Sequence, residues 1–341
     1  MKLVFCGTPQ FAVPSLEKLA SHGFAIQLVV TQPDRPQGRG MVMTAPPVKQ
    51  AAARLGLPVA QPDKIKKNEE FQQQLQAIAP EAIIVVGYGR IVPAWMLQLP
   101  ALGNINVHAS LLPKYRGAAP IQWAIARGET TTGVTTMRID EGLDTGDILL
   151  KREMAIHLDE TAETLSPRLA EMGAELLVET LRGLQDGKIS PTPQNHAEAT
   201  LAPILKKEDG LIDVQWTASE IHNRLRGFQP WPGIYTKFRD KNLKIIAAYP
   251  AAYSAGQTEN KEEPWSARAC PEVLAEGPPA AFAPEVQVKP GTLQIVDGRL
   301  LMRCGSRTVL ELLQLQPEGK KVISAREFIN GYRPTDGERL G

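Results

Sequence analysis

The sequence has few cysteines and few histidines, and they are scattered along the chain. The three cysteines, Cys6, Cys270 and Cys304, are odd in number and far apart, and none belongs to a Cys-x-x-Cys pair. This spacing argues against a disulfide framework and against a structural zinc site, and it favours a reducing compartment. The five histidines include no pair at helical spacing. We therefore expect no bound metal.

Long apolar runs are missing as well. No stretch approaches the roughly 18 consecutive apolar residues of a membrane-spanning helix. The first residues enter a short apolar run directly, without an extended apolar region or a small-residue cleavage site, so we expect no signal peptide. A net charge of +1 gives the whole chain no marked attraction for a polyanion. These absences favour a cytoplasmic protein, and nothing in the composition demands more than a monomer.

The first half of the chain alternates apolar strands with helical patterns. A length of 341 residues suggests two domains. Apolar strand-like runs at 3–6, 26–30, 59–60 and 82–86 are separated by helical stretches near 48–55 and 69–78. This order predicts a mostly parallel sheet covered on both faces, a Rossmann-like doubly wound α/β domain over residues 1–187. Further along we expect a helix at 118–127, strands at 134–139 and 147–151, and a long scaffold helix at 161–186.

The second half has a different pattern. Residues 188–205 are polar with several prolines and predict an extended linker. The remainder, 206–341, opens with a helix within 213–227 and continues with short strands near 234–239, 243–248, 292–296, 299–304 and 307–313. Closely spaced short strands predict a small β-barrel. An insert at about 251–290, rich in Pro, Ala and Glu, interrupts them and is expected to be a mobile loop.

Two polar side chains share one face of a predicted strand near residue 106. Ile105 and Val107 alternate with Asn106 and His108, so the two polar groups point the same way, roughly 7 Å apart. A strand end hydrogen-bonded to its own loop is the plainest interpretation. Asp144 favours a second one, because glycines flank its loop and would allow its carboxylate to approach the imidazole. An amide, an imidazole and a carboxylate together suit acyl transfer to an amine, because they can steady an oxyanion and exchange protons.

These residues lie in motifs that resemble the folate-dependent formyltransferase family. The motifs are Asn106-Val-His108, then Ser110-Leu-Leu-Pro113-Lys-Tyr-Arg116-Gly117, and later Asp140-x-Gly-x-Asp144-Thr-Gly-Asp147. The start, Phe5-Cys-Gly-Thr-Pro-Gln-Phe11-Ala-Val-Pro14, and the segment 32–40 are similar to those of the members that formylate initiator methionyl-tRNA. The resemblance extends over nearly the whole chain, except the insert.

The resemblance implies a donor, an acceptor and a mechanism. The donor is 10-formyltetrahydrofolate, and the acceptor is the free amino group of methionyl-initiator tRNA, which serves initiation of translation. Asn106, His108 and Asp144 are the implied catalytic residues, without a covalent enzyme adduct. The implied folate-binding residues form two loops: Gly87, Tyr88, Gly89 and Ile91, and Ser110, Leu111, Leu112 and Pro113.

The resemblance also implies contacts with tRNA. A loop of about sixteen residues, 32–47, carries Arg39, and the family uses this loop against the acceptor end of the tRNA. Lys206 and Lys207 are further candidates for phosphate contacts, in a domain that the resemblance identifies as an oligonucleotide-binding-like (OB-like) barrel. The insert holds three Lys and Arg but six Asp and Glu. Because the insert is acidic, we hypothesise that it lies away from the RNA.

Other functions remain open at this point. The same three catalytic residues would serve formylation of a small amine, such as glycinamide ribonucleotide or an amino sugar nucleotide. A folate- or RNA-binding protein without activity is a different class of alternative. A dinucleotide site is disfavoured, because Gly7-Thr-Pro9 is not a Gly-x-Gly-x-x-Gly loop and Pro9 lacks a backbone donor.

Overall fold

The computed structural model describes residues 1–37, 40–251 and 288–341. The chain divides into two compact units. The first contains residues 1–120, 131–155 and 164–203, and the second contains residues 121–130, 156–163 and 204–341. Most of the expected linker therefore lies with the first unit, while the domain boundaries at 187 and 206 stay a prediction. The insert expected at 251–290 falls almost entirely outside the described residues, as does Arg39.

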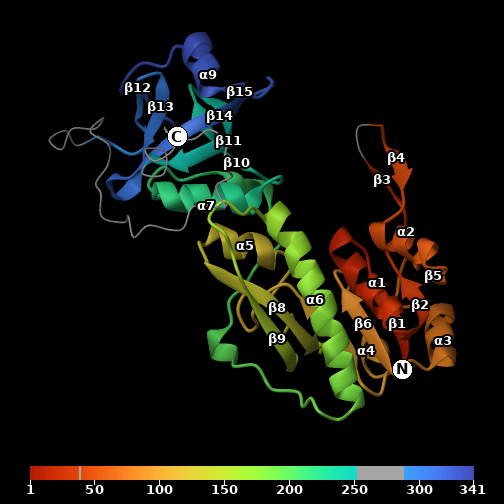
Figure 1. Ribbon diagram of the computed structural model, residues 1–341. Coiled ribbons are helices and arrows are strands. Elements are labelled where there is room, and N and C mark those ends of the chain that lie inside the picture. Colours follow the sequence, from red (N-terminus) through yellow and green to blue (C-terminus); the bar gives the residue numbers. More distant parts are fainter. Residues whose placement is uncertain (38–39, 252–287) are drawn as a thin grey trace. The chain divides into compact units, whose positions relative to one another are not determined.

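A seven-stranded sheet forms the centre of the first unit (Figure 1). Its order is β5-β2-β1-β6-β7-β8-β9, in which the first five strands are parallel and the last two are antiparallel to their neighbours. This confirms the Rossmann-like α/β prediction. The strands are β1 (Lys2–Gly7), β2 (Ala25–Val30), β5 (Val59–Ala60), β6 (Ala82–Val86), β7 (Asn104–His108), β8 (Thr131–Arg138) and β9 (Ile148–Ala155).

Helices cover both faces of this sheet. On one face, Val4, Cys6, Ile83 and Val85 pack into a buried cluster with residues of α3 (Glu69–Ile78) and α4 (Ala94–Leu97). On the other face runs the scaffold helix α6 (Ala162–Gln185), where a Cβ on Gly173 would lie 2.8 Å from a methyl group of Val107. The absence of a side chain at Gly173 thus allows α6 to approach β7 closely. Buried strands with both faces covered require the continuous apolar runs seen in the sequence.

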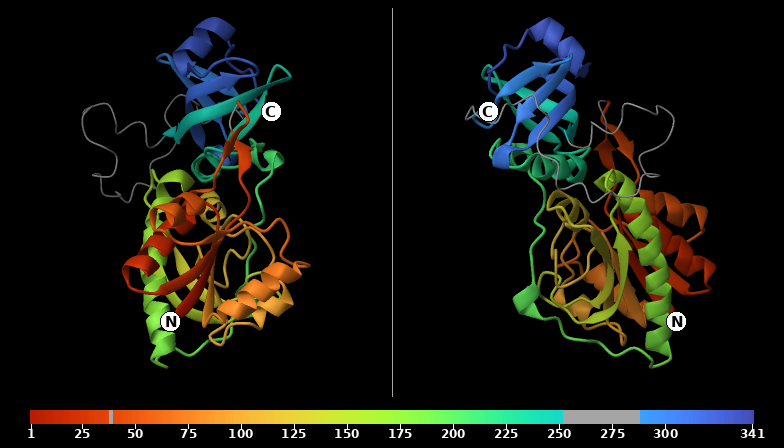
Figure 2. Two further views of the ribbon diagram at one scale, coloured as in Figure 1. Left: turned by 90° about the vertical axis from the view of Figure 1, so that its right-hand side faces the viewer. Right: turned by 60° about the vertical axis from the view of Figure 1, so that its left-hand side comes forward.

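The remaining elements that begin in the first unit are shorter. They are α1 (Val13–Ser21), α2 (Pro47–Arg54) and α5 (Pro120–Ala126), and a separate two-stranded ribbon of β3 (Arg35–Gln37) and β4 (Val42–Thr44). The ribbon occupies what was expected to be an irregular loop at 32–47 and projects from this unit (Figures 1 and 2). On β4 and just before it, Met41, Val42 and Met43 are each more than 60% exposed. The sequence has no alternation there, because no core lies beneath the ribbon.

The second unit is an antiparallel β domain, as expected. Its strand order is β10-β11-β14-β13-β12, with β15 pairing beside β14. The five predicted strands correspond to the first five members of this list, with shifted ends: β10 (Ile234–Phe238), β11 (Lys241–Pro250), β12 (Leu293–Val296), β13 (Arg299–Arg303), β14 (Val309–Pro317) and β15 (Ile323–Ser324). Ala251 and Val288, which border the undescribed segment, pack in one small cluster with Leu301 and Val309.

Two helices accompany this second sheet. The helix α7 (Ala218–Phe228) starts at a capping box in which Thr217 and Glu220 each satisfy the other's backbone N–H. The helix α9 (Ala325–Tyr332) starts in the same way, and Phe328 packs edge-on against Phe238 of β10. No helix in the described parts of the chain is both long and apolar enough to cross a membrane.

Candidate active site

The strand β7 places Asn106 and His108 at the carboxyl end of the parallel strands. Asn106 pairs with Val85 of β6 and with Met137 of β8, so its side chain continues the face that carries α3 and α4. Ligands of open α/β sheets bind at this edge. The local sequence is sufficient to fix this geometry, because side chains two residues apart on a strand share a face.

Asn106 and its neighbour Asn104 differ in their surroundings. The Asn104 amide is buried and donates to the carbonyl oxygens of Met96 and Leu97, at 3.0 and 3.1 Å, which fastens α4 to the sheet. The Asn106 side chain is half-buried, and the structure records no hydrogen bond from it to the described residues. Its N–H groups are therefore available to an incoming oxygen atom.

His108 is held in one orientation by a backbone carbonyl. Its side chain is buried, and Nε2 lies 2.9 Å from the Tyr115 carbonyl oxygen. A carbonyl can only accept, so Nε2 must carry a hydrogen. The other ring nitrogen, Nδ1, lies 3.7 Å from Oδ2 of Asp144. That distance is too long for a direct hydrogen bond but short enough for the carboxylate to stabilise an imidazolium. Nδ1 is thus the nitrogen that can gain and lose a proton.

Asp144 reaches this position from a tightly turned loop. Its backbone adopts a left-handed conformation with φ of 51°, which is uncommon for a residue with a side chain. The Gly117 amide donates to Oδ2 of Asp144 at 2.8 Å. Earlier in the loop, Asp140 accepts from the Thr145 hydroxyl and from the Gly142 amide. The structure therefore brings His108 and Asp144 together, as the glycine-flanked loop in the sequence suggested.

Two further residues support the site, and one of them, Gln194, escaped the sequence interpretation. Gln194, from the expected linker, is 6% exposed and donates to the carbonyl oxygens of Asp144 and Gly146. Arg116 is also buried and donates to the Gln194 side-chain oxygen. Sequence alone allows Arg116 either to support its loop or to meet an anion, and these bonds show loop support. A linker glutamine among polar residues carries no local signal of such a role.

The turn from Ser110 to Pro113 is tied to β8 behind it. Thr135 donates to the Ser110 carbonyl at 2.7 Å and accepts from the Leu112 amide at 3.1 Å. The Leu112 side chain is fully buried, whereas Leu111 is partly exposed. A ligand in this part of the site would therefore meet Leu111 and the backbone rather than the Leu112 side chain.

The second loop expected to bind folate contains two glycines with positive φ. Gly87 and Gly89 have φ of 55° and 75°, and a Cβ on Gly87 would lie 2.8 Å from the Pro9 ring. Gln32 donates to the carbonyl oxygens of Tyr88 and Gly89 and fixes the loop. The Tyr88 ring is buried, while Ile91 is 91% exposed. This loop presents backbone and one apolar side chain at the ligand edge of the sheet.

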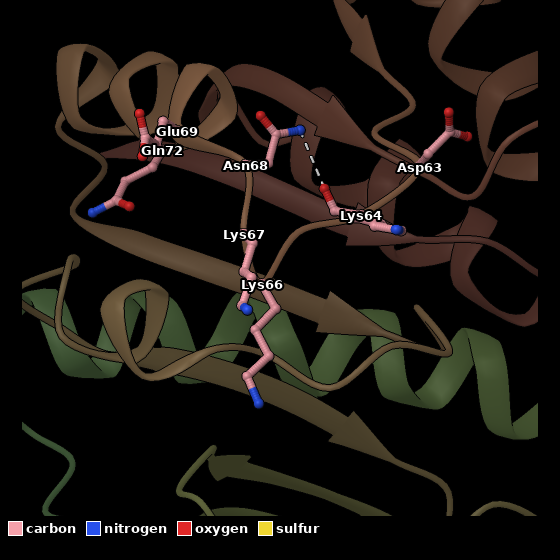
Figure 3. A pocket seen from close by; sticks show the side chains of 7 residues that line it. All are labelled: Asp63, Lys64, Lys66, Lys67, Asn68, Glu69 and Gln72. Carbon is pink, nitrogen blue, oxygen red and sulfur yellow. Dashed lines mark hydrogen bonds between the residues drawn. The ribbon is translucent and has the colours of Figure 1, made fainter.

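A surface hollow elsewhere in the first unit is lined by none of the expected catalytic or folate-binding residues. It involves the turn before α3, where Asn68 donates to the Lys64 carbonyl and Lys66 extends away from Asp63 (Figure 3). Its lining residues are Asp63, Lys64, Lys66, Lys67, Asn68, Glu69 and Gln72.

The expected phosphate-binding residues that the structure describes lie in the second unit. Lys206 and Lys207 are exposed at the start of a short 3-10 turn. Two arginines on α7 differ from these exposed lysines. The Arg224 guanidinium stacks over the Trp216 ring, 4.0 Å from its centroid. Arg226, in contrast, is buried and donates to the carbonyl oxygens of His157 and Glu160. It therefore supports the fold of this unit.

Neither a metal cluster nor a reactive thiol stands out in the described chain. Within residues 1–37, 40–251 and 288–341, no three His, Cys, Asp or Glu side chains gather as metal ligands. Complete burial raises the pKa of the Cys6 thiol far above its usual range, and burial raises the pKa of Cys304 to about 12. Both thiols stay protonated, so neither is a nucleophile. The described site is an amide, an imidazole and a carboxylate around one open edge.

Comparisons with known proteins identify relatives of this chain. The chain is 60% identical over 341 residues to the methionyl-tRNA formyltransferase of Koribacter versatilis (strain Ellin345), with 100% of this chain and 99% of the relative covered. It is 55% identical to the methionyl-tRNA formyltransferase of Acidobacterium capsulatum, with both chains fully covered. Among solved structures, the N-formyltransferase from Helicobacter canadensis in complex with folinic acid and dTDP-3-aminofucose has a TM-score of 0.62. It is 18% identical and covers 93% of this chain and 99% of its own, so this likeness concerns the fold.

Family matches cover both units. The formyl transferase family matches residues 1–181, and the C-terminal domain of formyl transferases matches residues 204–333. The two matched domains occur in the order expected from the motifs. This chain belongs to the formyl transferase family.

Proposed function

We propose that this chain transfers the formyl group of 10-formyltetrahydrofolate to the amino group of methionyl-initiator tRNA in the cytoplasm. The observation that carries the chemistry is the pairing of the buried His108 with the partly exposed Asp144, beside the open Asn106 amide. The choice of acceptor rests on the relative from Koribacter versatilis, which is 60% identical over the full chain.

In the proposed reaction the amine attacks the formyl carbon directly. A bond forms between the amine nitrogen and this carbon, and the carbonyl oxygen becomes an oxyanion, to which Asn106 donates a hydrogen bond. The proton that leaves the amine passes to the His108–Asp144 pair. The bond between the formyl carbon and the folate nitrogen then breaks, and that nitrogen takes a proton. No covalent bond to the enzyme is required.

The folate is proposed to bind between the two loops at the sheet edge. Gly87, Tyr88, Gly89 and Ile91 supply backbone groups and apolar cover on one side, because the glycines let a flat ring approach the main chain. The turn Ser110, Leu111, Leu112 and Pro113 borders it on the other side. The tRNA would contact Arg39, Lys206 and Lys207 through its phosphates.

Formylation of a small amine is the competing function. The solved neighbour from Helicobacter canadensis was crystallised with an amino sugar nucleotide, although its 18% identity argues for the fold alone. Purified enzyme and 10-formyltetrahydrofolate should be incubated with methionyl-initiator tRNA, uncharged tRNA, glycinamide ribonucleotide and an amino sugar nucleotide. We expect formylation of the charged tRNA alone. Turnover of a small amine without turnover of the tRNA would contradict the proposal.

A further inference from the structure

Gln194 uses all of its hydrogen-bonding capacity at the active site. Its Nε2 donates to the carbonyl oxygen of Asp144 at 2.9 Å and to that of Gly146 at 2.7 Å. Its Oε1 accepts from Nε and Nη2 of Arg116, at 3.1 and 2.6 Å. An amide has two N–H donors and two oxygen lone pairs, so every position is filled. A side chain this fully engaged and 6% exposed is not a solvated linker residue.

These bonds close a ring around the catalytic carboxylate. Arg116 binds Gln194, Gln194 holds the Asp144 carbonyl, and the amide of Gly117, which follows Arg116, donates to the Asp144 carboxylate. The backbone and the side chain of Asp144 are thus fixed from the same short segment. That segment also contains Tyr115, whose carbonyl accepts from His108. Residues 115–117, together with Gln194, therefore orient both members of the catalytic pair.

The Asp144 loop needs such support. A non-glycine residue in the left-handed region is strained by about 1–3 kcal/mol and persists only when its surroundings hold it. Asp144 has φ of 51° and lies between Gly142 and Gly146. A gap of 3.7 Å between His108 and Asp144 also leaves little tolerance, because a shift of about 1 Å can reduce turnover roughly 100-fold.

We infer that Gln194 is a positioning residue that keeps Asp144 beside His108. It does so by donating to the carbonyl oxygens of Asp144 and Gly146, while Arg116 holds Gln194 in place. The inference deepens the proposed function and rests on it for its kinetic test. It also gives part of the expected linker a task in the reaction, because the strand-like segment after α6 returns beside β9 at Thr192 and beside Arg116 at Leu201.

The first test combines Gln194→Leu with Asp144→Asn. Gln194→Leu removes the four hydrogen bonds at similar volume, and we expect kcat to fall about 10- to 100-fold while KM for the folate changes little. If Gln194 acts through Asp144, the double variant should be no slower than Asp144→Asn alone. Multiplied losses in the double variant, or a kcat of Gln194→Leu within twofold of the wild type, would overturn the inference.

The second test does not depend on activity. Hydrogen exchange at the Gly117 amide reports its bond to Asp144, and we expect it to be at least tenfold faster in Gln194→Leu. Gln50→Leu is the matched control, because Gln50 lies on α2 and donates to the Ala45 carbonyl, which precedes that helix. Unchanged exchange at Gly117 would refute the positioning role. Faster exchange in an enzyme that formylates no tRNA would uphold it and reject the proposed function instead.

A third variant guards against loss of folding. Gln194→Glu keeps an acceptor for Arg116 but replaces the donor with a carboxylate oxygen that faces two carbonyls. We expect the Arg116 pairing to preserve the fold and kcat to fall as in Gln194→Leu. Near-normal turnover in a folded Gln194→Glu would show that the donated bonds do not matter.

Discussion

Asn104 and Asn106 carry the same side chain two residues apart on β7, yet they serve different purposes. Alternation in the sequence places both on one face of the strand. It does not reveal that the carbonyls of α4 engage one amide and leave the other open. That distinction depends on where a separate helix ends, so no local pattern contains it.

Variants of Asn104 and Asn106 separate an effect on catalysis from an effect on stability. We expect Asn106→Ala to lower kcat about 100- to 1000-fold, because an oxyanion donor is lost, with little change in the unfolding free energy. Asn104→Ala should do the reverse and lower the unfolding free energy by about 1–3 kcal/mol, because two buried bonds are lost. Steady-state kinetics and urea unfolding measure the two effects. Near-normal turnover in Asn106→Ala would remove this residue from the mechanism.

Asp144 can be tested without changing the shape of its loop. Asp144→Asn retains an acceptor for the Gly117 amide but removes the charge beside His108. We expect kcat to fall at least about 100-fold with the fold preserved. Glu141→Gln is the control, since it removes an equal charge from an exposed position in the same loop. Equal effects of the two changes would mean that net charge, and not the pair, matters.

Among the elements, strands and long helices followed from periodicity, whereas contacts between distant loops did not. The predicted scaffold helix forms as α6, and its Leu165, Leu169, Leu177 and Leu181 are buried. Gln194 was missed because its partners lie at Arg116 and Asp144, far away in sequence. The β3–β4 ribbon was missed because an exposed hairpin needs no apolar face. Pattern predicts what an apolar core requires, and it reveals neither a buried hydrogen-bond network between distant residues nor an exposed hairpin.

The helix α7 contains a histidine that should make the second unit acid-sensitive. Burial, together with Arg226, lowers the pKa of His222 to about 4, although a bond to the Ala248 carbonyl acts in the opposite direction. The unfolded chain titrates near pH 6.5, so it binds a proton first as the pH falls. The free energy of unfolding therefore does not depend on His222 above about pH 6.5. It decreases by about 3 kcal/mol as the pH falls from there toward 4.

Denaturant unfolding between pH 4.5 and 7.5 measures this loss. His222→Gln retains a donor for the Ala248 carbonyl but does not titrate, so its stability should vary less with pH over this range. The other residues around this site, including His157, Glu129 and Arg226, remain the same in both proteins. Parallel curves for the wild type and the variant would assign the acid sensitivity to other groups.

At the scale of the whole molecule, the proposed function requires the second unit to bind RNA, although the chain is nearly neutral. We expect Lys206→Ala/Lys207→Ala to weaken the binding of all tRNAs alike and to reduce the slope of log affinity against log salt by about 2. Lys66→Ala/Lys67→Ala removes the same charge from the hollow before α3 and should leave the slope unchanged. A double variant of Lys206 and Lys207 that binds with the wild-type slope would exclude both from phosphate contact.

The cluster of Ala251, Val288, Leu301 and Val309 has a consequence for how this unit tolerates change. Ala251 and Val288 pack in the same small cluster, so the chain leaves the sheet and rejoins it at nearly the same place. Lengthening a chain between two such neighbouring anchors costs only about 0.6 kcal/mol for each doubling. We therefore expect a fluorescent reporter or purification tag inserted between residues 251 and 288 to destabilise the pairing of β11 and β12 with their neighbouring strands very little.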